Sequence, residues 1–266
     1  MDAINKPLET LDPEYIRQHI KAVTFDVDGV IVPTGTYLRE SVDGTELTIK
    51  THKISKEMIE IVKELKKYLW INISSGRALL YLEYMLEDIL WDKISLIAEN
   101  GNFILINGKM EQLSIYDQSY FQKITDIVRD LKKLKAEKPD VVHGFEPKQI
   151  IITVHTAEQM PEIGEIVQKH DPEHELYCLW SGEGYDIAHT KTNKETALEF
   201  LSQKLGIKPE EMITTGNNLN DREMLDFGIG VTVDPGNVSG AYAIPKKDGR
   251  LGGEVLARYL LNAFTR

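Results

Sequence analysis

Short apolar runs alternate with longer amphipathic segments along most of this chain. Apolar runs of four or five residues predict buried strands, and apolar positions three or four residues apart predict helices. The predicted strands cover 23–27, 70–73, 95–98, 212–215 and 229–233, and the predicted helices cover 58–69, 79–90, 194–205 and 255–264. Strands that alternate with helices predict an α/β fold with a mainly parallel sheet.

The pattern changes in the middle of the chain. Residues 103–109 predict a hairpin with an Asn-Gly turn. The next predicted elements are a long helix, a strand, a second helix and a strand pair, at 121–134, 149–155, from 161, 176–180 and 185–188. We therefore expect a Rossmann-like core at 1–107 and 188–266, interrupted by an inserted α+β domain at 108–187. A polar stretch at 33–53 with two alternating segments predicts a β-hairpin flap.

Composition narrows the choice of partners. The chain has 266 residues, 42% of them hydrophobic, and a formal net charge of -11. An acidic surface repels a phosphate backbone, so no nucleic-acid partner is expected.

The sequence shows neither a secretory signal nor an apolar run long enough to span a membrane. Cys178 is the single cysteine, which fits a reducing compartment, and we expect a cytoplasmic protein. The oligomeric state stays open, a homodimer included.

Two carboxylates stand at the end of the first predicted strand. Asp26 and Asp28 are two residues apart, so they start on the same side of the strand, and Gly29 allows the chain to leave it sharply. Carboxylates held together beside a core strand need a cation or a proton to compensate their repulsion. The pair is therefore predicted to bind a metal ion or to divide the roles of nucleophile and acid.

Polar groups also follow three other predicted strands. In open α/β sheets, ligands bind beyond the carboxyl ends of the strands. The polar groups there are Asp26 and Asp28, Ser74 and Ser75, Glu99 and Asn100, and Asn217 to Asp221, and Lys194 opens a helix after a loop. Acids, a hydroxyl and a lysine gathered at one edge suit phosphoryl transfer.

These residues resemble a known family. Asp26-Val27-Asp28-Gly29, Ser75-Gly76-Arg77, Lys194 and the segment from Gly216 to Asp221 are similar, in order, to the four motifs of the haloacid dehalogenase-like hydrolases. The insert resembles the α+β cap of their sugar-phosphatase-like branch. Ala98-Glu99-Asn100-Gly101 is similar to a segment of that branch's sugar-phosphate phosphatases and phosphomannomutases.

The resemblance implies a role for each matching residue. Asp26 would be the nucleophile that forms an aspartyl-phosphate, and Asp28 would exchange protons with the leaving group and water. Ser75, Gly76, Arg77 and Lys194 would bind phosphate or substrate, together with Glu99 and Asn100. Mg²⁺ would lie among Asp26, the main-chain carbonyl of Asp28, Asn217 and Asp221; it prefers oxygen ligands and keeps several waters.

One position departs from the family pattern. Asn217 stands where these proteins usually have an aspartate, so the predicted metal site lacks one negative charge. Metal affinity should fall, or Asp221 must move in as a ligand.

Several of these residues also have a purely structural interpretation. Ser74 or Ser75 is also a candidate helix cap, and Glu99-Asn100-Gly101 also has the composition of a plain turn. Arg77 is equally suited to pair with an acid of the scaffold. Lys191 competes with Lys194 for the phosphate, although the spacing to the following helix favours Lys194.

The sequence thus predicts a magnesium-dependent phosphatase that hydrolyses a small phosphorylated metabolite, a sugar phosphate or phosphorylated glycoside. Two alternatives remain open. One is a phosphomannomutase-type phosphotransferase, and the other is a phosphate-binding protein with a weakened metal site.

Overall fold

The computed structural model describes residues 4–245 and 249–266 and divides the chain into two compact units. The first unit contains the residues up to 34, 53–113 and 193–266; the second contains 35–52 and 114–192. The sequence analysis places the inserted domain at 108–187, whereas the longer segment of the second unit runs from 114 to 192 and the unit also includes residues 35–52 of the predicted flap. The mixed α/β class with a mainly parallel central sheet is confirmed.

A nine-stranded sheet forms the first unit within the described residues, in the order β1-β15-β14-β13-β2-β5-β6-β7-β8. The strands from β1 to β6 in that order run parallel, and β7 and β8 add an antiparallel hairpin at one edge. Their bounds are β1 Lys6–Pro7, β2 Ala22–Phe25, β5 Trp70–Ser74, β6 Ile94–Ala98, β7 Phe103–Ile106, β8 Lys109–Gln112, β13 Met212–Gly216, β14 Ile229–Thr232 and β15 Tyr242–Ala243. Because β8 belongs to this sheet, residues 108–113 belong to the first unit.

The helices of the first unit pack in two groups. Helices α1 and α2 contact α8, and α6 contacts α7. Their bounds are α1 Pro13–His19, α2 Lys56–Leu65, α3 Leu79–Met85, α6 Lys194–Leu205, α7 Arg222–Phe227 and α8 Gly252–Thr265, with 3₁₀ turns at Leu8–Thr10, Glu87–Ile89, Glu99–Gly101, Pro209–Glu211 and Leu219–Asp221. Ser55 caps α2 by accepting from the Met58 amide. The α6/α7 group shares a buried apolar cluster with the sheet that includes Ala22, Leu198 and Met224.

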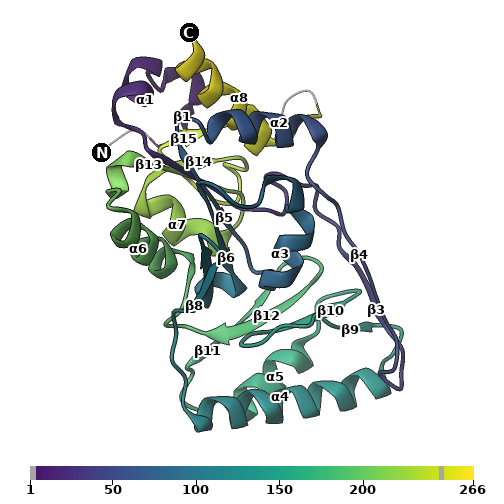
Figure 1. The fold of residues 1–266 in the computed structure, drawn as a ribbon. Helices are drawn as coiled ribbons and strands as arrows, with labels where there is room; N and C mark the ends of the chain where they lie inside the picture. Colours follow the sequence, from purple (N-terminus) through teal and green to yellow (C-terminus); the bar gives the residue numbers. More distant parts are fainter. Residues whose placement is uncertain (1–3, 246–248) are drawn as a thin grey trace. The chain divides into compact units, whose positions relative to one another are not determined.

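The second unit is built on a four-stranded antiparallel sheet, in the order β11-β12-β10-β9. Figure 1 shows α4 and α5 along one face of this sheet, and the two helices contact each other. The bounds are α4 Gln118–Glu137, β9 Val142–Phe145, β10 Ile152–Thr156, α5 Pro161–His170, β11 Leu176–Trp180 and β12 Gly184–His189. Strand β9 is absent from the sequence prediction; the other elements of the insert are present.

The predicted flap is an antiparallel ribbon of β3 (Tyr37–Glu40) and β4 (Leu47–Lys50). It packs on β9 of the second unit. The close approach depends on Gly144, with φ of +142°, because a Cβ there would lie 2.5 Å from Glu40 Cβ. The buried Lys135 strengthens the contact: its Nζ lies 3.1 Å from Glu40 Oε2 and donates to the Ser41 carbonyl at 2.6 Å. The ribbon is therefore part of the inserted unit.

Candidate active site

The polar strand ends meet at one edge of the nine-stranded sheet. Strands β13, β2, β5 and β6 are consecutive neighbours and run parallel. Their carboxyl ends therefore lie side by side. This adjacency brings together four segments that are widely separated in the sequence, as expected from the strand pattern.

A buried lysine joins two of the aspartates. Lys194 Nζ donates to Asp26 Oδ1 at 2.7 Å and to Asp221 Oδ1 at 2.6 Å. Asp26 is 7% exposed, Lys194 2% and Asp221 0%. Such charges are stable away from water only when they are paired. Of the two candidate lysines, Lys194 is thus the one that contacts Asp26, and Lys191 is exposed.

Strand geometry explains how these three residues meet. Ala22 packs into the cluster beneath α6 and α7. Side chains at alternate positions of a strand share a face, so Asp26 points to the same side as Ala22; its amide extends the ladder by donating to the Thr215 carbonyl at 2.9 Å. Lys194 is the first residue of α6, and Asp221 immediately precedes α7. The two helix starts therefore bring a cation and an acid to the end of β2.

The buried environment alters the acidity of Asp26. Burial, together with the neighbouring Asp221 carboxylate, raises the pKa of Asp26 to about 7, while Lys194 opposes the increase. For Lys194, burial alone would lower the pKa, but Asp221 and Asp26 outweigh burial and the pKa is raised. Asp26 is therefore only partly ionised near neutral pH, and further positive charge beside it would favour the nucleophilic carboxylate.

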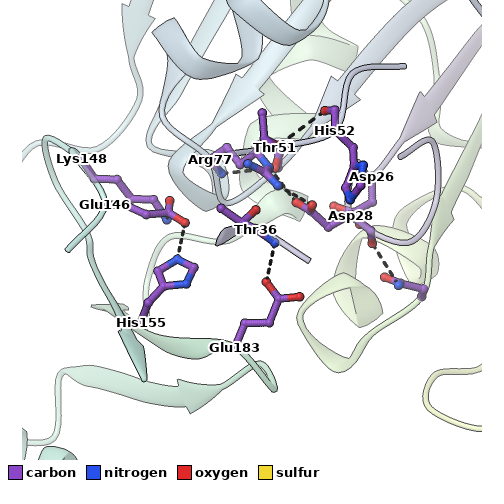
Figure 2. A network of polar contacts seen from close by, with 12 residues as sticks. Asp26, Asp28, Thr36, Thr51, His52, Arg77, Glu146, Lys148, His155 and Glu183 are labelled. Carbon is purple, nitrogen blue, oxygen red and sulfur yellow. Dashed lines mark hydrogen bonds and ion pairs between the residues drawn. The ribbon is translucent and has the colours of Figure 1, made fainter. Parts of the chain in front are cut away.

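Asp28 is held by Arg77. Arg77 Nε donates to Asp28 Oδ2 at 2.9 Å, and Nη2 donates to Oδ1 at 2.6 Å, as Figure 2 shows. The Arg77 guanidinium stacks 4.5 Å from the centre of the Tyr81 ring. A bidentate pair on an aromatic support fixes the orientation of the carboxylate. Tyr81 was not singled out from the sequence, because Arg77 precedes α3 and the four-residue spacing of a helix does not apply to the pair.

Ser75 and Gly76 shape the turn after β5. Ser75 Oγ accepts from the Arg77 amide at 3.2 Å, so it organises the segment that carries Arg77. A Cβ on Gly76 would lie 3.0 Å from Asn100 Oδ1, so glycine lets the Asn100 side chain approach. Neither Ser74 nor Ser75 caps α3, whose N-cap is Ala78 without a side-chain bond.

Glu99 and Asn100 connect the ends of β5 and β6 through their backbones. The Glu99 amide donates to the Arg77 carbonyl at 3.0 Å, and the Asn100 amide donates to the Ser75 carbonyl at 3.1 Å. Both have positive φ, 48° and 55°. A Cβ on Gly101 would lie 2.2 Å from the carbonyl oxygen of Asn193, the N-cap of α6. This turn therefore sets the positions of Arg77 and of the start of α6.

Both carboxylate oxygens of Asp221 accept hydrogen bonds. Besides the Lys194 contact, Asp221 Oδ2 accepts from the amides of Asn217 at 2.9 Å and Asn218 at 3.1 Å. Asn217 Nδ2 in turn donates to the main-chain carbonyl of Asp28 at 3.0 Å. The segment from Asn217 to Asp221 is thus tied both to Lys194 and to the Asp28 loop.

The donor set defines what metal these residues suit. Among residues 4–245 and 249–266, no three His, Cys, Asp or Glu side chains are grouped to hold a metal ion. If the Asn217 side-chain amide rotated by 180°, its Oδ1 would take the position from which Nδ2 now donates to the Asp28 carbonyl. The Lys194 contact uses only Oδ1 of Asp26. Asp26, the Asp28 carbonyl and Asn217 therefore fit Mg²⁺ as a set of oxygen ligands with little charge, whereas both oxygens of Asp221 are engaged elsewhere.

The first unit is thus an α/β fold with paired acids at the end of a central strand, and an α+β unit is inserted in its sequence. A family profile for haloacid dehalogenase-like hydrolases matches residues 41–142 and 129–239, and the chain belongs to this family. The family resemblance drawn from the sequence motifs is therefore confirmed.

Curated relatives carry phosphatase names. The phosphoglycolate phosphatase of Haloarcula marismortui is 22% identical over 190 residues, 70% of this chain and 78% of that protein. The phosphoglycolate phosphatase of Methanopyrus kandleri is 22% identical over 199 residues, 74% of this chain and 83% of that protein. The expected class of enzyme, a phosphatase, agrees with these matches.

A solved structure shares the fold. The C-terminal domain of trehalose-6-phosphate phosphatase from C. albicans aligns with 99% of this chain and 97% of its own, with a TM-score of 0.67 and 18% identity. At that identity the likeness concerns the fold alone.

In the part of the chain that the structure describes, no helix is long and apolar enough to cross a membrane.

Proposed function

We propose that this protein is a magnesium-dependent phosphatase that hydrolyses a small phosphorylated metabolite through a phosphorylated Asp26. The observation that carries the proposal is the buried contact of Asp26 with Lys194, next to an Asp28 carboxylate that Arg77 holds in one orientation. A nucleophile, a cation and a second acid at one strand end are the parts that phosphoryl transfer uses.

The two acids divide the reaction between them. An oxygen of Asp26 attacks phosphorus and the bond from phosphorus to the ester oxygen breaks. Asp28, protonated once Arg77 has moved away from it, gives its proton to that oxygen. Water then attacks the aspartyl-phosphate, Asp28 accepts a proton from the water, and the bond between phosphorus and Asp26 breaks. Lys194 offsets negative charge beside Asp26 in both steps. Ser75 and Arg77 keep the segment opposite Asp28 in place.

Magnesium would be held by Asp26, the Asp28 carbonyl and Asn217, and when bound it would neutralise charge on the transferred phosphoryl group. Its positive charge would also favour the ionised form of Asp26, whose pKa burial raises to about 7.

The second unit also contains a polar cluster. Glu146 Oε1 lies 2.7 Å from His155 Nε2, Glu146 Oε2 lies 3.1 Å from Lys148 Nζ, and Lys148 also contacts Thr153 and Asp186 (Figure 2 shows Glu146, Lys148 and His155). Thr153 and Asp186 are cross-strand partners on one face of β10 and β12. The opposite face carries Tyr185, whose hydroxyl bonds to Met160 at the start of α5.

This cluster consists of Glu146, Lys148, Thr153, His155 and Asp186, whose side chains are paired with one another.

We propose that the metabolite is a sugar phosphate or phosphorylated glycoside. The proposal is supported by the resemblance of Ala98-Glu99-Asn100-Gly101 to sugar-phosphate phosphatases and by the fold that the chain shares with a trehalose-6-phosphate phosphatase domain.

A substrate panel tests the proposal. Phosphate release would be measured with Mg²⁺ from hexose phosphates, disaccharide phosphates, 2-phosphoglycolate and p-nitrophenyl phosphate. Release should depend on Asp26, so Asp26→Asn is inactive, while the matched variant of the exposed Asp226, Asp226→Asn, retains activity. Folded protein that releases no phosphate from any member would contradict a phosphatase. Interconversion of hexose 1- and 6-phosphates without release would instead identify a phosphotransferase.

A phosphate-binding protein is the second candidate, and Asn217 is the observation that favours it, because the metal site has lost a carboxylate. Calorimetry distinguishes the two: binding of inorganic phosphate that is unaffected by Mg²⁺, with no turnover, would support a binding protein.

We also propose that the enzyme is cytoplasmic, supported by its single cysteine, Cys178, which is a free thiol. Burial raises the pKa of that thiol to about 11, so it is unreactive. Fractionation of cells tests the compartment, and light scattering of the purified protein tests for a homodimer.

A further inference from the structure

Asn217 places a hydrogen-bond donor where the proposed metal site needs an acceptor. Its Nδ2 donates to the main-chain carbonyl of Asp28 at 3.0 Å. The amide is also packed against Gly29, since a Cβ at that residue would lie 2.3 Å from Nδ2. A cation that binds the Asp28 carbonyl must therefore first displace this N–H and turn the amide.

Asp221 is not available to replace the missing carboxylate. Its two oxygens serve Lys194 and two loop amides, and the residue is 0% exposed. Drawing Asp221 toward a metal would leave two partly buried amides without their acceptor and the buried Lys194 with Asp26 alone, and breaking these bonds costs free energy. The loop therefore keeps Asp221 as a structural anion.

The charges of the free site offer a dication little attraction. Asp28 is neutralised by Arg77, and Lys194 is shared between Asp26 and Asp221. The site thus holds one net negative charge when both Asp26 and Asp221 are ionised. A bound phosphate dianion would add two negative charges and further oxygen ligands. Such a change in charge is large enough to decide whether Mg²⁺ binds.

We propose that Asn217 makes metal binding conditional on phosphate: the free protein binds a divalent cation weakly, and a phosphate group completes the site. The inference rests on the proposed function only in taking this edge of the sheet as the phosphate site. Because coupling between two ligands is reciprocal, the cation strengthens phosphate binding by the same factor. Coupling of this kind amounts to roughly 5- to 150-fold in affinity.

The test titrates the full chain with Mn²⁺ followed by electron paramagnetic resonance, alone and with saturating inorganic phosphate. For the natural chain, phosphate should tighten Mn²⁺ binding at least about fivefold. Asn217→Asp should bind Mn²⁺ alone about tenfold more tightly and show a smaller effect of phosphate. Asn220→Asp, which adds the same charge at an exposed side chain, should behave like the natural chain. Thermal unfolding confirms that each variant is folded.

Two results would overturn the inference. One is Mn²⁺ affinity in the natural chain equal to that of Asn217→Asp without phosphate; the other is no change of affinity on adding phosphate. If Asn217→Asp does not fold, Asn217→Ala serves instead: it removes the N–H that competes for the Asp28 carbonyl, so Mn²⁺ alone should bind more tightly and gain less from phosphate than in the natural chain. None of these readouts requires turnover, so they stand apart from the phosphate-release assay, which tests the phosphatase proposal.

Discussion

At the residue scale, the site depends on one lysine that compensates two buried acids. Asp26 and Asp221 both contact Lys194 Nζ, and all three residues are buried. Two buried carboxylates that share one partner repel each other, and the positive charge of Lys194 compensates this repulsion. The same lysine therefore contributes both to folding and to the proposed chemistry.

Lys194→Met should abolish phosphate release and destabilise the protein. Removing one partner of a buried ion pair leaves uncompensated charge and costs roughly 3–5 kcal/mol in free energy of unfolding. Urea unfolding measures this loss. The control is Lys191→Met at the exposed lysine three residues earlier, which should leave stability and activity close to the natural values. Equal effects of the two substitutions would contradict the assigned role of Lys194.

Asp26 also predicts a pH dependence of stability in the absence of metal. Its folded pKa is raised from 3.8 to about 7. Between these values the folded chain retains a proton that the unfolded chain has lost, so the free energy of unfolding should fall as pH rises from about 4 to about 7. Asp26→Asn should remove this contribution. Thermal unfolding in EDTA across that range measures it; an unchanged slope in Asp26→Asn would argue against a raised pKa.

At the element scale, the order of strands explains why the site forms. Neighbouring parallel strands place their carboxyl ends together, so Asp26, Ser75 and Asn217 meet although the chain separates them widely. Apolar runs of four or five residues were sufficient to predict these strands. They did not reveal β9, which contains His143 and Gly144 within four residues, because neither residue favours a strand.

The ribbon β3–β4 was predicted as a hairpin, but its attachment to the second unit was not. That attachment depends on Gly144, about a hundred residues further along the chain, which leaves room for Glu40. A contact between residues so far apart in the sequence leaves no periodic pattern of apolar positions that would predict it. The hydrogen bond from Asn217 to Asp28 could not be predicted from the sequence either. The identity of residue 217 shows that a carboxylate is missing, but it does not show which atom of the amide faces the Asp28 carbonyl.

Gly144→Ala should loosen the ribbon. The added Cβ would meet Glu40 Cβ at 2.5 Å and Leu38 Cδ2 at 2.9 Å, and the backbone has φ of +142°. Overpacking of this kind costs roughly 1–3 kcal/mol. Gly164→Ala in α5 is the matched control, since nothing lies within 4 Å of its Cβ, and it should be neutral or slightly stabilising. Thermal unfolding compares them; a loss of stability in Gly164→Ala as large as in Gly144→Ala would contradict this packing.

At the scale of the whole molecule, the chain divides its tasks between two units. The first contains the paired acids and Lys194, and the second contains the ribbon and the polar cluster. Fold class and family followed from the sequence because the motifs lie at strand ends. The substrate did not follow from the sequence, because the four motifs specify the chemistry at phosphorus and not the rest of the molecule that carries the phosphate.

The central claim is that Asp26 becomes phosphorylated during turnover. The most direct measurement is acid quenching during steady turnover, followed by peptide mass spectrometry of the segment that contains Asp26. With p-nitrophenyl phosphate, whose leaving group needs no proton, Asp28→Asn should accumulate the intermediate, because water then lacks its base, and the added phosphoryl group should map to Asp26. A turning-over enzyme with no phosphoryl group on Asp26 in either the natural chain or Asp28→Asn, or with the group on another residue, would contradict the account.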